Sequence, residues 1–486
     1  MPKLTKMTPF RMIDNLYFVG TKEASSHLID TGDGLILIDT GYDITADAVI
    51  ESMNILGFDV ADVKIILHSH GHYDHTGGTK KILSLANNAK TYLSFKDIKY
   101  ITGFTPDFDI LDGDVIRLGN TEIYCMFTPG HTEGSVSFFF DVKENGQTYR
   151  AAMFGGAGTN QLKKAFMDAH DVPYLCRGYF FDSIDRLLKE KVDVMIGNHS
   201  WHNHTPEKYE RMSTSEKNPF IDPSEWKPFL EKLKSKLWET IENESREHFV
   251  TYAHRGASQY CPENTFMSFY MGARLGANGI ETDVQVTKDK VLVLFHDKTL
   301  ERVTGEPGAV SDYTYKELCN FFVKNGELCD RIPTLEDFLA HFSFRDMTFA
   351  IELKVSGIEK EVVDLICKYN LQKKAVVTSF GFENICLVKE YMPTMRVGYL
   401  CKNVSEESLA QMIEREIDEL CPRGRDVTAE KVKEWHRMGF NVRAWGITDT
   451  DVMKSVYDAG VDGMTVNFPD LLVEYVEKSK TIVDNQ

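Results

Sequence analysis

Four potential metal ligands lie within six residues in the first half of the chain, directly after a short apolar run. The run at 63–67 predicts a β-strand, and the residues after it read His-Ser-His-Gly-His-Tyr-Asp-His-Thr-Gly-Gly. His70, His72, Asp74 and His75 offer three imidazoles and a carboxylate on one loop, where alternate side chains can converge on a cation. The spacing therefore predicts a metal site at the end of a strand, and the fold must be one that can build such a site.

Short apolar runs separated by turn residues surround this loop. The runs at 15–20, 27–32 and 34–41 predict β-strands joined by tight turns, and residues 44–56 predict a helix. The first half should therefore be built from sheets with helices packed on them.

Two further histidines follow later predicted strands. His131 lies in Thr-Pro-Gly-His-Thr-Glu-Gly-Ser, and His199 follows the apolar run at 192–198. His202 and His204 come soon after, so this segment offers three possible registers for a ligand. We favour His199 because it comes first after the strand. Together with the loop, these histidines could complete a metal site.

In this order, Leu37-Ile-Asp-Thr-Gly, the His70 loop, Pro129-Gly-His and His199 resemble the metallo-β-lactamase superfamily over residues 1 to about 245. The resemblance implies a four-layer αβ/βα sandwich with two metal ions, usually zinc, with iron or manganese as alternatives. It implies that Asp39 is a structural residue or one that contacts the ligands. The implied ligand sets are His70, His72 and His131 for one ion, and Asp74, His75 and His199 for the other.

One part of the resemblance is incomplete. Most hydrolases of the superfamily carry a metal-bridging Asp after a later strand, whereas residues 153–160 here read Met-Phe-Gly-Gly-Ala-Gly-Thr-Asn. This is more similar to the lactamase subclass with five histidines and one aspartate. A hydroxide would then link the metals, and a zinc-bound water with a pKa lowered toward 7 would attack an ester or phosphoester. The alternatives are a lactamase- or thioesterase-type hydrolase unrelated to phosphodiesters, or a binding or scaffolding module without catalysis.

The second half follows an amphipathic helix predicted within 223–247. We place the domain boundary after it, giving domains 1–246 and 247–486. Strands alternating with helices then predict a parallel β/α barrel, so the fold class is α/β with a sandwich followed by a TIM (β/α)8 barrel. The predicted strands are 249–253, 279–284, 291–295, 348–353, 375–379, 396–400, 440–445 and 463–466.

Three carboxylates of the barrel are candidate ligands for a hard cation. Glu281 and Asp283 are two residues apart on a predicted strand and therefore share a face, where they would repel each other without a cation. Glu352 follows on a later strand with Lys354 on the same face. Oxygen ligands favour Mg²⁺ or Ca²⁺. His254 ends the first barrel strand, and His296 follows another, which places two acid/base candidates where barrels keep their chemistry.

These motifs resemble the glycerophosphodiester phosphodiesterase family over residues 249 to about 475. They are His254-Arg-Gly, Pro262-Glu-Asn-Thr, Glu281-Thr-Asp-Val, Phe295-His-Asp, Ile332-Pro-Thr-Leu, Ile351-Glu-Leu-Lys and Gly460-Val-Asp-Gly. The resemblance implies hydrolysis of a small-molecule glycerophosphodiester to glycerol 3-phosphate and an alcohol. It implies that His254 and His296 are the general acid/base pair and that Glu281, Asp283 and Glu352 are the metal ligands. Arg255 and Lys354 would contact the phosphate, and Glu263 and Asn264 would orient the site. Trp445 would contact the glycerol or the alcohol, or alternatively be a core aromatic residue.

One residue near the C-terminus departs from that family. The family commonly has Thr-Asp after Gly-Val-Asp-Gly, whereas this chain has Asn467 in that region. We expect this change to affect a secondary contact without touching the acid/base pair or the three carboxylates.

Composition narrows the partners and the surroundings. The formal charge of −18 opposes binding to nucleic-acid backbones. No run of about 18 apolar residues and no signal-peptide core occurs. The nine cysteines show no disulfide spacing. We therefore expect a soluble, cytoplasmic enzyme of small molecules.

Overall fold

The computed structural model describes residues 5–484, with side chains described up to residue 480, and these form two compact units. The first unit contains residues 1–166 and 176–239, and the second contains 167–175 and 240–486. The predicted boundary at 246/247 falls at the end of helix α7 (Trp226–Glu247) and stays a prediction. Both units are mixed α/β structures.

Two sheets form the middle of the first unit. The six-stranded sheet has, in order, β1 (Phe10–Ile13), β2 (Leu16–Phe18), β3 (His27–Asp30), β4 (Leu35–Ile38), β5 (Val63–Leu67) and β6 (Lys90–Tyr92). The five-stranded sheet has, in order, β11 (Val194–Ile196), β10 (Gln147–Met153), β9 (Val136–Glu144), β8 (Thr121–Phe127) and β7 (Val115–Leu118). The strands and the helix predicted before the histidine loop are confirmed.

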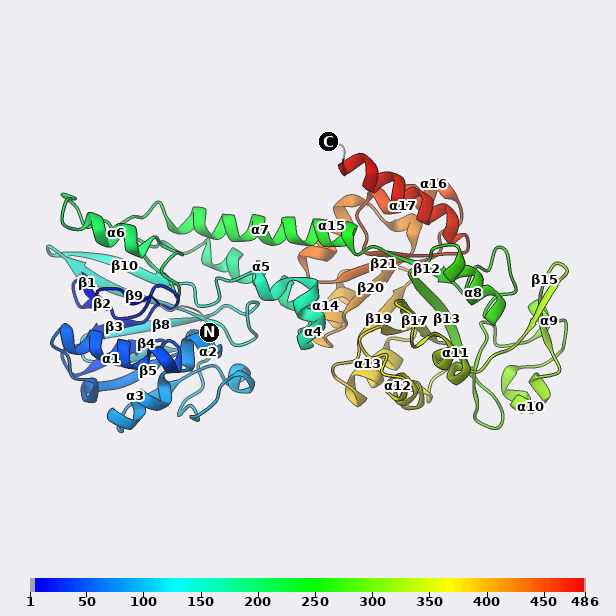
Figure 1. Cartoon of the computed structure of the whole chain (residues 1–486), viewed down its shortest axis with the longest axis horizontal. Coiled ribbons are helices and arrows are strands. Elements are labelled where there is room, and N and C mark those ends of the chain that lie inside the picture. The colour runs from blue at the N-terminus through cyan, green and yellow to red at the C-terminus, as the bar shows by residue number, and fades with distance from the viewer. Residues whose placement is uncertain (1–4, 485–486) are drawn as a thin grey trace. The chain divides into compact units, whose positions relative to one another are not determined.

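Helices cover the outer faces of both sheets (Figure 1). The helices that lie wholly or partly in this unit are α1 (Ala46–Ile55), α2 (Tyr73–Thr76), α3 (Thr79–Leu85), α4 (Lys164–His170), α5 (Leu175–Leu187), α6 (Thr205–Arg211) and α7. In strand β9, Phe138 and Phe140 face the core between the sheets, whereas Phe139 contacts Trp226 of α7 on the outside. This two-residue alternation fits a strand covered on both sides, and the result is the four-layer sandwich expected from the sequence.

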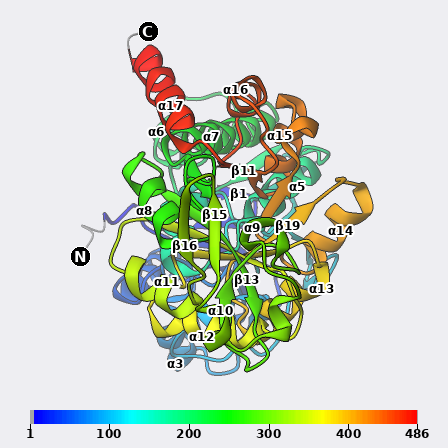
Figure 2. The ribbon, with the colours of Figure 1, turned by 90° about the vertical axis from the view of Figure 1, so that its right-hand side faces the viewer.

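Eight parallel strands close the second unit into a barrel. Around the ring they are β12 (Val250–His254), β13 (Gly279–Val286), β17 (Thr348–Leu353), β18 (Ala375–Ser379), β19 (Val397–Cys401), β20 (Glu419–Pro422), β21 (Asn441–Ala444) and β22 (Gly463–Val466), with β22 pairing with β12. Helices surround the strands (Figure 2). They are α8 (Phe266–Arg274), α9 (Glu301–Thr304), α10 (Tyr315–Leu318), α11 (Leu335–Phe342), α12 (Glu359–Lys368), α13 (Phe382–Tyr391), α14 (Glu406–Glu414), α15 (Ala429–Arg437), α16 (Thr450–Asp458) and α17 (Pro469–Asp484).

The predicted barrel strands differ from the observed ones in two places. The predicted strand at 291–295 is β14 (Leu292–Leu294), which pairs antiparallel with β13 and is not one of the eight parallel strands. A separate two-stranded sheet, β15 (Phe322–Asn325) with β16 (Leu328–Arg331), follows it. The eighth parallel strand is β20, which the sequence analysis missed because its glutamate, Glu419, makes the segment look polar.

Glu419 lies inside the barrel because a buried arginine neutralises it. Arg443 of β21 is 1% exposed, and its Nε donates to Glu419 Oε1 at 2.6 Å. Its other nitrogens donate to Thr465 Oγ1 at 2.9 Å and to Cys421 Sγ at 3.4 Å. The pair links β20, β21 and β22 across the interior, so a polar sequence can form a buried strand.

Breaking this pair is expected to destabilise the barrel strongly. Glu419→Ala leaves the Arg443 guanidinium buried without its carboxylate, which should lower the free energy of unfolding by about 3–5 kcal/mol. Urea unfolding of the full chain measures this loss in the transition that belongs to the barrel. The double variant Glu419→Leu/Arg443→Met is the control and should lose less, and an equal loss in both variants would contradict this account of β20.

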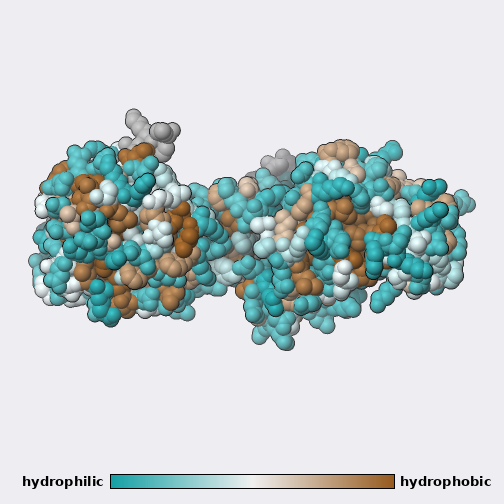
Figure 3. Space-filling model, turned by 90° about the horizontal axis from the view of Figure 1, so that it is seen from below, coloured by the Kyte–Doolittle hydropathy of each residue, from teal (hydrophilic) through white to brown (hydrophobic). Residues whose placement is uncertain are grey.

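Within residues 5–484, no helix combines the length and the apolar character needed to cross a bilayer. The face shown in Figure 3 is mostly hydrophilic with separate hydrophobic patches.

Candidate metal centres

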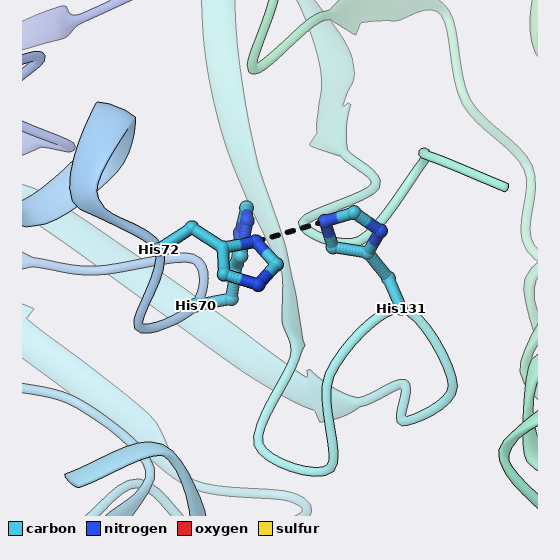
Figure 4. Close-up of side chains that lie close together, drawn as sticks. All are labelled: His70, His72 and His131. Atoms are coloured by element: carbon cyan, nitrogen blue, oxygen red, sulfur yellow. Dashed lines mark hydrogen bonds between the residues drawn. The ribbon is translucent and has the colours of Figure 1, made fainter. Parts of the chain in front are cut away.

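Three histidines from two loops converge in the first unit (Figure 4). His70 and His72 come from the loop after β5, and His131 comes from the loop between β8 and β9. One ring nitrogen from each lies within 4.8 Å of the others, and His72 Nδ1 is 3.1 Å from His131 Nε2. The strand ends therefore bring together the first predicted ligand set.

The second predicted set also comes together. A carboxylate oxygen of Asp74 and one ring nitrogen each of His75 and His199 lie within 4.8 Å of one another. His202 and His204 line the neighbouring cavity, but neither joins a group of this kind among the described residues. Among the three registers, the geometry therefore favours His199.

Hydrogen bonds from the protein orient these rings from outside. His131 Nδ1 donates to the carbonyl of Gly158 at 2.8 Å, and His199 Nδ1 donates to the carbonyl of Glu23 at 2.6 Å. In both rings Nε2 is then the atom left to bind a cation, which is how outer partners set the tautomer of metal-binding histidines.

The carboxylate of Asp39 accepts hydrogen bonds from the loop that follows β5 and carries the candidate ligands. Its Oδ1 accepts from the backbone N–H of Ser69 at 2.8 Å, and its Oδ2 accepts from Ser69 Oγ at 2.7 Å and from His75 Nδ1 at 2.9 Å. The carboxylate is fully buried and acts on the ligands without joining either group of three.

Burial favours the neutral imidazoles that metal binding requires in three of these histidines, whereas His75 behaves differently. Burial lowers the pKa of His131 and His199 to about 4 and the pKa of His72 to about 3. For His75, burial opposes the charge, but the carboxylates of Asp74 and Asp39 outweigh it and raise the pKa to about 10. The buried Nε2 of His70 has no hydrogen-bond partner among the described residues, and Nε2 of His75 lies 3.3 Å from Asp74 Oδ2. Two groups that together supply five imidazoles and one carboxylate fit transition-metal ions such as zinc.

The segment that lacks the bridging aspartate packs tightly against its neighbours. A Cβ at Gly155 would lie 1.9 Å from the carbonyl oxygen of Val136, and a Cβ at Gly158 would lie 2.8 Å from His131 Cε1. The glycine-rich segment therefore packs directly against the ligand loop and leaves no room at these positions for an aspartate. The two groups share no carboxylate among the described residues.

Asp97 is a buried residue of the site that the sequence analysis missed. Its Oδ2 accepts from the N–H of Gly71 and from Thr132 Oγ1, both at 2.7 Å, and its Oδ1 accepts from the N–H of Gly134 at 2.8 Å. It thus ties the loop of His70 to the loop of His131. No local signal marks it, because it lies in the segment Phe-Lys-Asp-Ile-Lys far from either loop in sequence.

Removal of this carboxylate should loosen the metal site without removing a ligand. Asp97→Ala is expected to weaken metal binding about 10- to 100-fold, the usual effect of losing an outer-shell partner. Competition with a chromophoric chelator measures the affinity. Asp107→Ala, which removes a nearby carboxylate bound to Thr91 and Lys90, is the matched control. Equal affinity in the Asp97 variant and the wild type would contradict the proposed link between the loops.

A cavity of about 640 Å³ opens beside these histidines. Trp201 lines it and stacks on His199 with ring centroids 4.5 Å apart, and Phe229 and Lys232 of α7 line the same cavity. A small molecule could therefore reach both groups of ligands from one side.

The barrel contains the third group. One carboxylate oxygen each of Glu281, Asp283 and Glu352 lies within 4.8 Å of the others, and all three side chains are buried. Burial and the neighbouring carboxylates raise the pKa of Glu281 well above its ordinary value. Burial and Asp283 raise the pKa of Glu352 to about 7. Buried Asp283 Oδ1 has no hydrogen-bond partner among the described residues. Three crowded oxygen donors of this kind fit a hard divalent cation.

Two cations border the carboxylates. Lys354 Nζ is 2.6 Å from Glu352 Oε1 and 3.5 Å from Asp283 Oδ1. The backbone N–H of Arg255 donates to Glu281 at 3.0 Å, and its guanidinium lies 3.3 Å from Asp283 and 2.9 Å from Glu263. Both predicted phosphate contacts therefore lie beside the predicted ligands.

Asn264 holds one of these ligands in place. Its Nδ2 donates to Asp283 Oδ2 at 2.8 Å, while its Oδ1 accepts from Thr282 Oγ1 at 2.8 Å. The Pro-Glu-Asn-Thr motif thus contacts the site through both its acidic residue and its amide.

The two candidate acid/base histidines are each oriented by one partner. His254 Nδ1 donates to Asn467 Oδ1 at 2.5 Å, and His254 Nε2 is 3.9 Å from Glu281. His296 Nδ1 donates to Asp297 Oδ1 at 2.6 Å. The expectation that Asn467 does not touch the acid/base pair is therefore wrong, because this residue follows the last barrel strand and contacts a candidate catalytic histidine directly.

β14 explains how His296 reaches the barrel mouth. Strand β13 continues beyond its neighbours, β14 returns antiparallel beside it, and the N–H of Phe295 donates to the carbonyl of Asp283 at 3.0 Å. Arg302 then connects this segment to the site, because it pairs with Asp297 and lies 2.6 Å from Glu263. The sequence analysis missed Arg302, which carries no motif of its own.

Trp445 follows the seventh strand of the ring at the same mouth. It is half-buried, its Nε1 donates to the carbonyl of Cys421 at 3.0 Å, and its ring lies 5.0 Å from that of Phe380. It is therefore neither a fully buried core residue nor an exposed one.

Comparison with family models gives a match in each half. The model of the glycerophosphoryl diester phosphodiesterase family matches residues 254–471, and the model of the metallo-beta-lactamase superfamily matches residues 19–144. Both matches include the candidate ligands of their unit, apart from His199.

Individual proteins match the two halves separately. The glycerophosphodiester phosphodiesterase of Caldanaerobacter subterraneus subsp. tengcongensis is 33% identical over 238 residues, which are 47% of this chain and 98% of that protein. The glycerophosphodiester phosphodiesterase of Bacillus altitudinis is 32% identical over 243 residues, 47% of this chain and 98% of the relative. Among solved structures, the FEZ-1 metallo-beta-lactamase from Legionella gormanii is 28% identical and covers 50% of this chain and 98% of its own, with a TM-score of 0.46.

Proposed function

Because the second half of this chain belongs to the glycerophosphodiester phosphodiesterase family, we propose that its barrel cleaves a glycerophosphodiester to glycerol 3-phosphate and an alcohol. The observation that carries the proposal is the convergence of Glu281, Asp283 and Glu352 at the mouth beside His254. The family supports glycerophosphodiester hydrolysis, and the geometry supports the roles of the individual residues.

The two histidines act as general acid and base. The Nδ1–H of His254 donates a hydrogen bond to Asn467, which leaves Nε2 to face the substrate. His296 is held in the same way by Asp297. One ring removes a proton from the attacking nucleophile, and the other gives a proton to the leaving alkoxide. Their outer hydrogen bonds direct Nε2 of each ring toward the substrate, where the base has a free lone pair and the acid, as an imidazolium, carries the proton that it gives to the alkoxide.

The charged groups around the histidines bind and polarise the diester. Glu281, Asp283 and Glu352 would hold a Mg²⁺ or Ca²⁺ ion, which when bound draws charge from the non-bridging phosphate oxygens. Arg255 and Lys354 contact the same phosphate from the side. Glu263 holds Arg255 in position, since the carboxylate also pairs with Arg302.

The proposal is tested by the cation dependence of the full chain. After dialysis against a chelator, addition of Mg²⁺ or Ca²⁺ should restore release of alcohol from a panel of glycerophosphodiesters. Glu281→Gln should lose this response. The proposal fails if no diester of the panel releases alcohol with either ion.

For the first unit we propose a metal-dependent hydrolase of an ester or phosphoester. Two groups of three ligands, oriented from outside and open to one cavity, support catalysis rather than a scaffolding role. His70, His72 and His131 would hold one divalent ion and Asp74, His75 and His199 another. When bound, these ions supply Lewis acidity and lower the pKa of water. The protein's own part is to align the imidazoles, and burial keeps those of His72, His131 and His199 neutral.

A further inference from the structure

The mouth of the barrel is divided into two parts by the kind of residue that follows each strand. In a parallel barrel the carboxyl ends of all strands meet at one mouth. The carboxylates and histidines come from β12, β13, β14 and β17. The residues directly after the next five strands of the ring are Phe380 (β18), Lys402 (β19), Arg423 (β20), Trp445 (β21) and Asn467 (β22).

Four of these residues form one cluster that adjoins the carboxylates. The rings of Phe380 and Trp445 meet at right angles with centroids 5.0 Å apart. Lys402 Nζ lies 5.7 Å from the centre of the Phe380 ring, and the Arg423 guanidinium lies 5.9 Å from the centre of the Trp445 ring. Phe380 is also 6.0 Å from Nζ of Lys354, the lysine bound to Glu352. The cluster is thus continuous with the candidate catalytic groups.

The cations of this cluster differ from those of the catalytic part. Arg255, Arg302 and Lys354 are each within ion-pair distance of two or more carboxylates. Within residues 5–480, Lys402 and Arg423 make no ion pair, although the chain has 73 acidic against 55 basic residues. Their positive charge at the mouth is therefore available to a ligand.

We propose that Lys402 and Arg423 form a subsite for a negatively charged group on the alcohol of the diester. This rests on the proposed diesterase function. Glycerol is neutral and common to every substrate, so a pair of cations can discriminate only through the second alcohol. A phosphate or carboxylate on that alcohol would meet complementary charge, whereas a trimethylammonium group would meet repulsion. Aromatic rings can bind a trimethylammonium group, but here Lys402 and Arg423 lie next to the rings of Phe380 and Trp445.

The test uses the full chain, Mg²⁺ and a matched pair of substrates. Glycerophosphoinositol and glycerophosphoinositol 4-phosphate differ only by a phosphate on the alcohol, and glycerophosphocholine supplies the opposite charge. We expect kcat/KM to be at least about 10-fold higher for the phosphorylated diester, with the choline diester poorest. In Lys402→Gln/Arg423→Gln the ratio between the matched pair should fall to about 1.

Arg425→Gln is the control, because it removes one positive charge from an exposed residue that is close to Arg423 in the chain and pairs with Asp426. Its ratio should equal that of the wild type, and thermal unfolding shows that both variants are folded. A wild-type ratio near 1, or a ratio retained in the double variant, would overturn the subsite while leaving the diesterase in place. Failure of all three substrates would instead overturn the diesterase function and the subsite with it.

Discussion

Replacement of His254 by alanine is expected to lower kcat for glycerophosphodiester hydrolysis by about 10²- to 10⁴-fold, the range that a positioned general acid or base contributes. The effect should fall mainly on kcat, because His254 faces Glu281 and Asn467, whereas Arg255 and Lys354, the proposed phosphate contacts, remain in place. Steady-state kinetics with a saturating divalent cation measures it.

The control for this variant is His341→Ala, which removes an exposed histidine on α11. This change should leave kcat unaltered, since His341 makes a hydrogen bond to the carbonyl of Asp337 and a ring contact with Phe266, neither of which is a candidate catalytic group. If His254→Ala kept more than about a tenth of wild-type kcat, the acid/base assignment would be wrong.

Replacement of His70 by alanine is expected to remove at least one of about two transition-metal ions per chain. His70 is buried in the group with His72 and His131, and its unpartnered Nε2 cannot be replaced by a methyl group. The diesterase activity should persist, because its ligands are three carboxylates of the other unit. Elemental analysis of the purified full chain, together with the diesterase assay, measures both.

His199 and His202 provide a matched pair for the same measurement. His199→Ala should lose metal, because this ring joins Asp74 and His75, whereas His202→Ala should keep it. If His202→Ala loses metal and His199→Ala keeps it, the last ligand is His202 and not His199. A wild-type chain that binds no transition metal would favour a binding module over a hydrolase.

The strands that precede most candidate site residues could be predicted, because each of these strands is an apolar run in the sequence. The prediction failed at β20, where Glu419 is paired with Arg443 from a neighbouring strand, so that a buried strand has a polar sequence. It also assigned 291–295 to the barrel, since an apolar run shows a strand but not the direction in which it pairs. Pairing direction depends on chain connections that no local pattern contains.

The site residues divide in the same way. Candidate ligands that share a short motif, such as Glu281 and Asp283, could be proposed from spacing alone, and the structure brings their carboxylates together. Asp97 and Arg302 could not, because each acts by joining segments that are distant in sequence. The choice among His199, His202 and His204 required the fold, since all three follow the same strand.

The identity of the products tests the central claim most directly. Phosphorus NMR of glycerophosphoinositol incubated with the full chain and Mg²⁺ follows the diester and its phosphomonoester product in one sample. Hydrolysis as proposed predicts that the resonance of glycerol 3-phosphate grows as that of the diester disappears. Formation of inositol phosphate in its place, or an unchanged diester resonance, would contradict it.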